Sequence, residues 1–238
     1  MWFLPSKVSV RESGMLEGFC DCHCHLLPGV DDGVKKTAET LRILQLWAEV
    51  GVREVWLTPH IMEDMPNEPA KLEDGYHQLL SSYEGNITLH LAAEHNLDGL
   101  FMERMADNQL MPIFADKKHL LVETSYFIPP MNMDAIMDAI KKKGYQPILA
   151  HPERYQYMNQ ADYRRWKDAG VQLQLNVPSL VGAYGPKAQK NAQWLFKQGM
   201  YDYCGSDTHS LSQVELFFNS IISRKTAKMI RTLFRKND

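Results

Sequence analysis

Acidic and histidine residues alternate near the start of the chain, at Asp21, His23 and His25. If residues 18–23 begin a β-strand, every second side chain points the same way, so these three share one face and the cysteines between them share the other. Two imidazoles on one strand face can bind a single divalent metal ion. The pair alone is weak evidence, because chance produces a His-x-His pair about as often as a metal site does.

Further ligand-type residues fall where most of the other expected strands end. In an α/β barrel the C-terminal ends of all strands surround one face, where active sites are built. Asp31 and Asp32, in the first loop, would lie over the same face. Each residue alone could instead be a buried histidine, an ion-paired acid or a helix cap. Together they predict a site. The residues at these strand ends are His60, Glu94, Glu123, His151, Asp207 and His209.

This set of histidines and carboxylates, without a thiolate pattern, suits Zn²⁺, Mn²⁺ or Fe, and outnumbers the ligands of one ion. We therefore expect a cluster of two or three ions. Bound ions lower the pKa of a bridging water, neutralise phosphoryl oxygens and support a leaving oxygen, which suits hydrolysis of a phosphate ester. Arg154, close after His151, could bind phosphate oxygens through two N–H groups. An ion pair with Glu153 or another surface acid is the equally weighted alternative.

The elements that must position these residues alternate regularly along the chain. Short apolar runs rich in β-formers are followed by longer amphipathic segments, several of which end at a capping glycine such as Gly51 or Gly144. Parallel strands need crossover connections, so this alternation predicts a parallel sheet. The expected strands cover residues 18–23, 54–58, 87–93, 120–124, 147–150, 171–177 and 201–205, and the expected helices cover residues 35–50, 69–83, 99–108, 133–143, 160–169, 186–198 and 212–236.

The repeated βα unit favours a barrel over the alternative, a doubly wound open sheet. A chain of 238 residues is long enough for one domain of this kind. We expect an N-terminal extension over residues 1–17 and a single barrel domain over residues 18–238.

Composition and charge narrow the classes of function. Hydrophobic residues make up 45% and charged residues 23% of the chain, which is ordinary for a soluble globular protein. A net charge of −3 offers no general attraction to nucleic acid. No apolar run is long enough to predict membrane insertion. The basic stretch 224–236 is interpreted as a solvated helix face rather than as an anion site.

The four cysteines point to a reducing compartment. Cys20, Cys22 and Cys24 alternate along one strand, where they are poorly placed to bridge one another, and Cys204 is distant in sequence. We therefore expect a cytoplasmic protein without disulfides. None of the cysteines is followed by the arginine of a C-x5-R phosphate loop, so we expect no cysteine nucleophile.

The segment 21–33, DCHCHLLPGVDDG, closely resembles the opening motif of the CpsB/CapC branch of the PHP (polymerase and histidinol phosphatase) superfamily. Members of that branch are bacterial metal-dependent protein-tyrosine phosphatases of capsule and exopolysaccharide synthesis. The resemblance spans residues 18–209, nearly the whole chain. Matching motifs follow in the same order at residues 58–60, 93–94, 122–123, 150–155 and 206–209, and more loosely at 175–185.

The resemblance implies a distorted TIM-like (β/α)7 barrel, the PHP fold, with a trinuclear centre. It implies Mn²⁺, with Fe or Zn²⁺ as the other candidates, and phosphotyrosine on the tyrosine-rich tail of a bacterial tyrosine kinase as the substrate. Arg154, Asp207 and His209 are expected to act in catalysis. The implied ligand sets are His23, His25 and Asp207 for one ion, Glu123 and His151 for a second that shares Glu94 with the first, and Asp32, His60 and His209 for a third.

The chain departs from the family pattern in two places. The family commonly has a phosphate-binding arginine shortly after its Ser-Asp-Ala-His motif, whereas residues 210–215 here read SLSQVE. Arg154 would then act alone, or a cation from the basic C-terminal segment would substitute. The second departure is His95, which follows Glu94 where the family usually has an apolar residue.

Two other functions stay open from the sequence. One is a PHP-type phosphatase of a small metabolite, such as histidinol phosphate or a nucleotide. The other is a metal-bound regulatory module without turnover. The sequence also leaves the oligomeric state open, and a homo-oligomer is one alternative.

Overall fold

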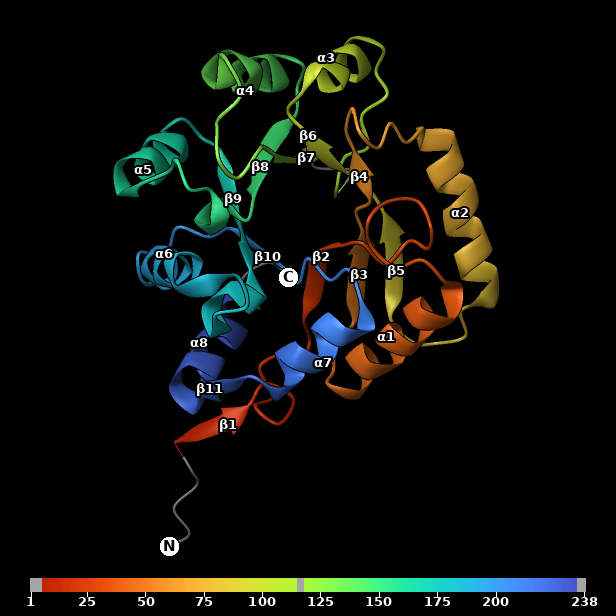
Figure 1. Cartoon of the computed structure of the whole chain (residues 1–238), viewed down its shortest axis with the longest axis vertical. Coiled ribbons are helices and arrows are strands. Elements are labelled where there is room, and N and C mark those ends of the chain that lie inside the picture. The colour runs from red at the N-terminus through yellow and green to blue at the C-terminus, as the bar shows by residue number, and fades with distance from the viewer. Residues whose placement is uncertain (1–5, 115–117, 235–238) are drawn as a thin grey trace, which may run out of the picture.

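The computed structural model describes residues 6–114 and 118–234 of the chain. Its parallel strands β2–β10 gather in the middle of the molecule and helices α1–α6 surround them, while β1 and β11 lie at one edge (Figure 1). The strands are β1 Lys7–Ser9, β2 Cys20–Cys24, β3 Glu54–Leu57, β4 His60–Ile61, β5 Thr88–Leu91, β6 Glu94–Asn96, β7 His119–Glu123, β8 Gln146–Ala150, β9 Gln172–Asn176, β10 Tyr203–Gly205 and β11 Ile221–Ser223. The helices are α1 Thr37–Glu49, α2 Pro69–Ser82, α3 Gly99–Ala106, α4 Met133–Lys142, α5 Gln160–Asp168, α6 Gly185–Lys197, α7 Leu211–Asn219 and α8 Arg224–Phe234, with 3-10 turns η1 Pro152–Arg154 and η2 Val177–Val181.

The central strands form two parallel ladders, one in the order β10-β9-β8-β7-β6-β4 and the other in the order β2-β3-β5. The parallel α/β architecture expected from the βα alternation is therefore confirmed. The expected strands over residues 54–58 and 87–93 are each followed by a second short strand. Pro59 separates β3 from β4 because it has no N–H to donate to a ladder. The second strands carry His60 and Glu94.

The first and last of these parallel strands also meet. A parallel bridge joins Cys24 to Thr208. The His25 N–H donates to the Thr208 carbonyl at 2.9 Å, and the Asp207 N–H donates to the His23 carbonyl at 2.8 Å. The residues just after β10 are thus held against the C-terminal end of β2. Closure of the whole set into a (β/α)7 barrel stays a prediction at this point.

The strands are buried on both faces, as parallel strands between helices must be. Leu120 and Val122 belong to the main core beneath the helices, while Leu121 between them faces a smaller cluster on the other side of the sheet. That smaller cluster includes Trp56, Ile113 and Ile148. Apolar side chains therefore cover both faces of the sheet, and the ligand-type residues lie at the strand ends.

The two ends of the described chain pack together. β1 pairs antiparallel with β11, and Val10 and Leu16 are buried in the main core. The prediction of one helix over residues 212–236 is wrong, because β11 separates α7 from α8. Apolar periodicity continues through this stretch, but pairing with β1 makes residues 221–223 extended. Residues 235 and 236, the last cations of the basic stretch, lie outside the described residues. The domain boundary at residue 18 stays a prediction.

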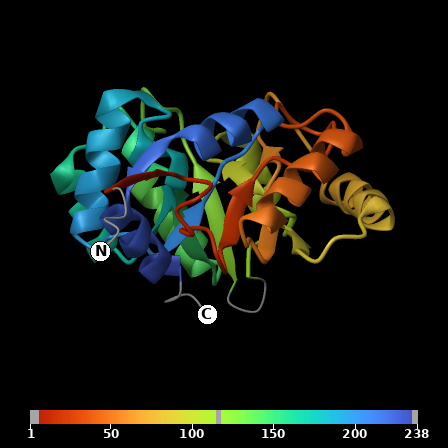
Figure 2. The same cartoon turned by 90° about the horizontal axis from the view of Figure 1, so that it is seen from below.

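Helix α7 lies across one end of the strands, and α8 lies at the other end (Figure 2). In the described part of the chain, every helix is too short or too polar to cross a membrane. The predicted cytoplasmic location is not tested by this finding.

Candidate metal centre

The metal-ligand candidates predicted from the strand ends come together at the C-terminal ends of the strands. They form four overlapping groups, and within each group the ligand atoms lie within 4.8 Å of one another. The groups are His23, His25 and Asp207; His23, Glu94 and His151; His60, Glu94 and Glu123; and His25, Asp32, His60 and His209.

Glu94 lies in the middle of this arrangement. Its Oε2 is 3.1 Å from His23 Nε2 and 3.2 Å from His60 Nδ1, and its Oε1 is 3.0 Å from His151 Nε2. The Glu94 side chain is fully buried. If ions bind here, Glu94 could serve as a ligand to more than one of them, because imidazoles lie beside both of its oxygens.

The groups reproduce two of the ligand sets that the resemblance implies and divide the third. His23, His25 and Asp207 stand together, and His209, Asp32 and His60 stand together with His25 added. Glu123 Oε1, however, is 3.2 Å from His60 Nδ1, whereas its Oε2 is 3.9 Å from His151 Nε2. The geometry therefore brings all of these candidates together, while the assignment of ligands to individual ions stays a prediction.

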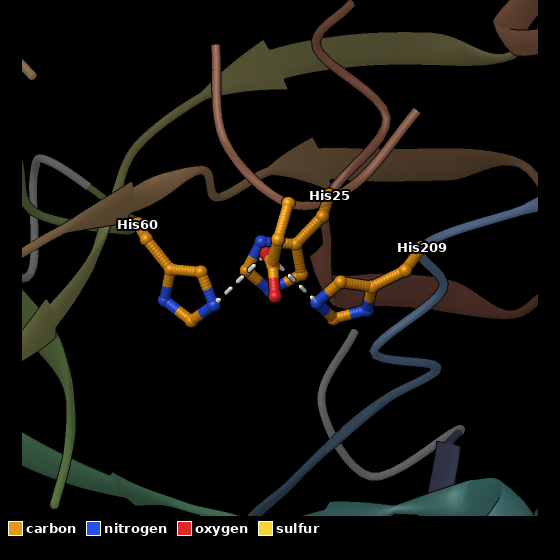
Figure 3. Close-up of side chains that lie close together, drawn as sticks. His25, His60 and His209 are labelled. Atoms are coloured by element: carbon orange, nitrogen blue, oxygen red, sulfur yellow. Dashed lines mark ion pairs between the residues drawn. The ribbon is translucent and has the colours of Figure 1, made fainter. Parts of the chain in front are cut away.

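One side of the cluster is open to solvent. The Asp32 side chain is 59% exposed and that of His209 is 21% exposed, whereas His25 is fully buried. Asp32 Oδ1 is 3.5 Å from Nε2 of both His60 and His209. Figure 3 shows His60 and His209 on either side of His25, with their rings directed inward. A substrate would reach the centre from this side.

The buried carboxylates of the centre stabilise positive charge on neighbouring groups. Burial lowers the pKa of His23, but the charges of Glu94 and Asp207 outweigh it and raise that pKa to about 9. Burial likewise raises the pKa of Glu94, but His23 and the neighbouring imidazoles bring it well below its ordinary value. Burial also lowers the pKa of His25, but Asp207, Asp31 and Glu94 outweigh it and raise that pKa. Protons on His23 and His25 therefore compensate the buried carboxylates when no metal is bound. A divalent cation would supply the same positive charge.

The donor atoms also fit a metal. Glu94 Oε2 and His60 Nδ1 are buried and make no well-aligned hydrogen bond among the described residues, although they lie 3.2 Å apart. Buried polar atoms normally have a partner, and a bound ion would provide one for those that face the cluster. Carboxylate oxygens and imidazole nitrogens suit Mn²⁺, Fe or Zn²⁺, and no thiol belongs to the groups.

A second layer of residues orients the histidines. Asp31 Oδ2 lies 2.8 Å from His25 Nδ1, and Gln174 Oε1 lies 3.0 Å from His23 Nδ1. An acceptor at Nδ1 holds the proton there, so that Nε2 presents its lone pair to the cluster. Burial raises the pKa of Asp31, but the hydrogen bond and charge of His25 lower it to about 2.

Sequence reasoning missed Gln174 and Asn176, although a pattern for them was present. Strand β9 reads QLQLN, and both amides are fully buried. Polar residues at every second position of a strand that is covered on both faces indicate a polar cluster on one of them. Asn176 Nδ2 donates to Asp207 Oδ2 at 3.1 Å. A residue of β9 therefore helps to orient Asp207, the ligand candidate that follows β10.

Arg154 lies beside Asp207 at the edge of the cluster. Its Nη1 donates to Asp207 Oδ2. Its guanidinium carbon is 4.5 Å from the centre of the Tyr126 ring and 4.1 Å from that of Tyr184. Cation–π contacts of this kind fix the plane of the guanidinium. The arginine is therefore held next to the ligand candidates.

The alternative ion pair between Arg154 and Glu153 does not form. Glu153 is buried, and its carboxylate accepts hydrogen bonds from the Tyr201 hydroxyl and the Asn176 N–H, both at 3.0 Å. These contacts anchor the turn η1, which carries Arg154, to strand β9. Burial raises the pKa of Glu153 to about 7.

The cysteines do not take part in the cluster. Cys22 Sγ donates to the Cys204 carbonyl and Cys24 Sγ donates to the Trp56 carbonyl. Burial raises the pKa of the Cys22, Cys24 and Cys204 thiols well above its usual range. Their thiolate forms are therefore scarce, which agrees with the expectation of no cysteine nucleophile.

The structure gives His95 a role in the core. His95 is a buried core residue whose Nε2 accepts the Met111 N–H at 3.2 Å, and burial lowers its pKa to about 4. His95 is therefore neutral.

Part of the basic C-terminal segment lies far from the cluster. In α8, Arg231 pairs with Glu17, which precedes β2 and thus lies at the end of the strands opposite the cluster. Arg231 is therefore not placed to substitute for the missing arginine, and substitution by another cation of the basic C-terminal segment stays a prediction.

Gly205 is needed where β10 approaches β2. A Cβ atom there would lie 2.4 Å from His23 Cβ and 2.7 Å from Gln174 Nε2. We expect Gly205→Ala to lower the free energy of unfolding of the metal-free protein by about 3 kcal/mol in urea titrations. Gly75→Ala is the control: its site in α2 has no neighbour nearer than 3.8 Å. The control should raise stability by about 1 kcal/mol. Equal effects of the two substitutions would contradict this account.

Comparison with known proteins gives consistent matches. A family model described as "Capsular polysaccharide synthesis, CpsB/CapC" matches residues 19–237. Tyrosine-protein phosphatase YwqE of Bacillus subtilis is 27% identical over 197 residues, 80% of this chain and 77% of that protein. Tyrosine-protein phosphatase CpsB of Streptococcus pneumoniae is 25% identical over 234 residues, 91% of this chain and 95% of that protein.

A solved structure shares the fold. It comes from work titled "Crystal structures of YwqE from Bacillus subtilis and CpsB from Streptococcus pneumoniae, unique metal-dependent tyrosine phosphatases". The match has a TM-score of 0.74 at 24% identity and covers 92% of this chain and 95% of the other.

Proposed function

This chain belongs to the CpsB/CapC family, and on that premise we propose that it is a metal-dependent protein-tyrosine phosphatase. Relatives that match most of the chain are tyrosine-protein phosphatases by name. The observation that carries the proposal is the set of overlapping His and carboxylate groups with Arg154 at its edge. A multi-metal cluster beside an arginine suits phosphoryl transfer, where charge neutralisation and positioning are the main requirements.

We propose that the cluster holds two or three ions, with Mn²⁺ first and Fe or Zn²⁺ as the other candidates. The three implied ligand sets would hold them, with Glu94 shared. Bound ions would supply Lewis acidity, which activates water and withdraws charge from phosphoryl oxygens. We also infer that the two ladders and the Cys24–Thr208 bridge together form a distorted (β/α)7 barrel, since they bring the ends of the parallel strands to one face.

The protein's own residues then bind and orient the phosphate. Nη1 of Arg154 is engaged by Asp207, so its remaining N–H groups are available to phosphoryl oxygens. The Tyr126 and Tyr184 rings keep the guanidinium from rotating away. His209 Nδ1 is 2.9 Å from the Asp207 carbonyl oxygen, which directs Nε2 towards the open side, near Asp32. Asp207, Arg154 and His209 thus form one unit at the entrance.

The open side favours a phosphate on a macromolecule. Asp32 and His209 are accessible, whereas Glu94 and His23 are buried, so a phosphate can enter while the rest of its carrier stays outside. We propose a phosphotyrosine protein as the substrate, in the cytoplasm, with the tail of a bacterial tyrosine kinase as the implied partner. A small-metabolite phosphatase and a regulatory module without turnover are the alternatives that the assay must exclude.

Metal removal and thiol modification test the proposal together. We expect EDTA, followed by desalting, to reduce kcat/KM on a phosphotyrosine peptide at least about 100-fold. Added Mn²⁺ should restore it. Iodoacetamide should change it less than about twofold, because the buried thiols remain protonated.

The reverse pattern, sensitivity to alkylation with resistance to chelation, would overturn the metal mechanism. Parallel assays with histidinol phosphate and a nucleoside monophosphate decide the substrate class. A higher kcat/KM on either small substrate would favour the metabolite phosphatase, and absence of turnover on all of them by the metal-loaded protein would favour the regulatory module.

A further inference from the structure

The surface beside Arg154 has features that the metal cluster does not explain. A cavity of about 210 Å³ opens there. Tyr126 and Phe127, which follow β7, form part of its wall, and Tyr184 and Lys187, at the start of α6, form another part. Two segments that are distant in sequence therefore meet around the arginine.

Arg154 connects this cavity with the cluster. Its Nη1 contacts Asp207, while its guanidinium carbon lies over the rings of both Tyr126 and Tyr184. Arg154 also lines the cavity itself. A molecule whose phosphate binds at the cluster against Arg154 would thus have its next groups at the mouth of the cavity.

The loop that follows β7 exposes several large apolar side chains. Phe127 is 67% exposed, Ile128 is 71% exposed and Met131 is 89% exposed. Single exposed apolar residues are ordinary, but several of them in one short loop are typical of a binding surface. The same loop begins directly after the ligand candidate Glu123. The apolar surface therefore adjoins the entrance of the cluster.

Lys187 adds a positive charge at the other wall. Its ammonium donates to the Gln156 carbonyl oxygen at 2.9 Å, and its side chain is exposed. Among the residues that the structure describes, Lys187 forms no ion pair. A carboxylate on a bound molecule could therefore pair with the Lys187 ammonium, whose charge has no acidic partner among the described residues.

Resting on the phosphatase activity proposed above, we propose that this surface binds the polypeptide that flanks the phosphotyrosine. Phe127 and Ile128 would contact an apolar side chain of that polypeptide, and Lys187 would contact an acidic residue near the phosphotyrosine. The preferred substrate class is then an acidic phosphotyrosyl segment of a protein. The surface would determine specificity, while the cluster and Arg154 carry out the reaction.

The test compares three substrates on the metal-loaded full-length protein. They are a phosphotyrosine peptide flanked by leucine and glutamates, the same peptide with glutamines in place of the glutamates, and p-nitrophenyl phosphate. The variants are Lys187→Gln and the double variant Phe127→Ser/Ile128→Ser. Matched controls are Lys190→Gln, at an exposed lysine in the next turn of α6, and Ile221→Ser, at a residue that is 61% exposed on the distant β11.

The informative quantity is the ratio of kcat/KM between substrates. Lys187→Gln should lower the ratio of acidic to neutral peptide about threefold, within the range expected for one exposed ion pair. The double variant should lower the ratio of either peptide to p-nitrophenyl phosphate about tenfold, mainly through KM. Both controls should keep wild-type ratios. Circular dichroism melting confirms that each variant is folded.

Each failure has a distinct meaning. Wild-type ratios in all variants, with phosphotyrosine turnover intact, would overturn the docking surface and leave the proposed function standing. Absence of phosphotyrosine turnover in the wild type would overturn both. If sedimentation shows a wild-type dimer that the double variant dissociates, with unchanged ratios, the apolar loop contacts a second copy of this chain and the docking proposal fails.

Discussion

We expect Glu94→Gln to lower kcat on a phosphotyrosine peptide by about 10³-fold and to reduce the metal content of the protein. Glu94 belongs to two of the ligand groups, and its oxygens contact His23, His60 and His151. Glutamine keeps the volume but presents an N–H₂ group and no negative charge. It therefore cannot bridge two ions. Steady-state kinetics with elemental analysis of the purified variant gives both quantities.

The same variant has a second expected effect, visible without metal. The charge of Glu94 contributes to raising the pKa of His23 to about 9, against burial, which lowers it. A raised histidine pKa stabilises the metal-free fold fully below pH 6.5, and this contribution is lost as pH rises through about 9. In Glu94→Gln, NMR titration should show a lower pKa for His23, and the loss of stability should begin at lower pH.

Glu49→Gln is the matched control, since Glu49 is 41% exposed and pairs with Arg11 on the surface. It should keep metal content and kcat within about twofold of the wild type. A Glu94→Gln protein that retains both its metal and its turnover would show that Glu94 is not a shared ligand.

Arg154→Lys should lower kcat/KM about 100-fold on the phosphotyrosine peptide and on p-nitrophenyl phosphate alike. Lysine carries the charge but lacks the planar fork of N–H groups that can pair with Asp207 and with phosphoryl oxygens in a fixed geometry, and it lacks the flat group that lies over the Tyr126 and Tyr184 rings. Equal losses on both substrates separate Arg154, which binds the phosphate, from Lys187, whose substitution should change the ratio between substrates.

The control for this variant is Arg11→Lys, at an arginine that is 52% exposed and paired with Glu49. It should change kcat/KM less than about twofold. Elemental analysis tells whether Arg154→Lys has also disturbed Asp207 and hence the metal. If kcat/KM of Arg154→Lys stays at the wild-type value, phosphate must be bound by the metal ions without help from the arginine.

Much of this site could be predicted because its residues lie at the ends of parallel strands. The C-terminal ends of parallel strands lie on one face whatever the sequences of the connecting helices are. His60, Glu94 and His151 could therefore be placed together from their positions in the sequence alone. The second layer was less visible. Asp31 was placed near the face but without a role, and Gln174 was missed, because an amide in a strand has many ordinary explanations.

Other features depend on contacts that no local pattern encodes. Residues 212–236 keep a helical apolar periodicity, yet residues 221–223 form a strand because β1 is available beside them. From the sequence, Arg154 could bind phosphate or form an ion pair with Glu153 or another surface acid, and in the structure it pairs with the buried Asp207. Glu153 is not available to Arg154 because it is buried and accepts hydrogen bonds from Tyr201 and Asn176. These contacts join residues that are far apart along the chain, so no local pattern predicts them.

The pairing of β1 with β11 has a consequence for biosynthesis. Ser9 leaves the ribosome long before its partner Ile221, because most of the described chain lies between them. Until then β1 has an unpaired edge, which is a point of risk for aggregation in a nascent chain. Short length and the lysine at its first position, Lys7, reduce that risk. We therefore expect β1 to dock among the last steps of folding, after the parallel strands have assembled.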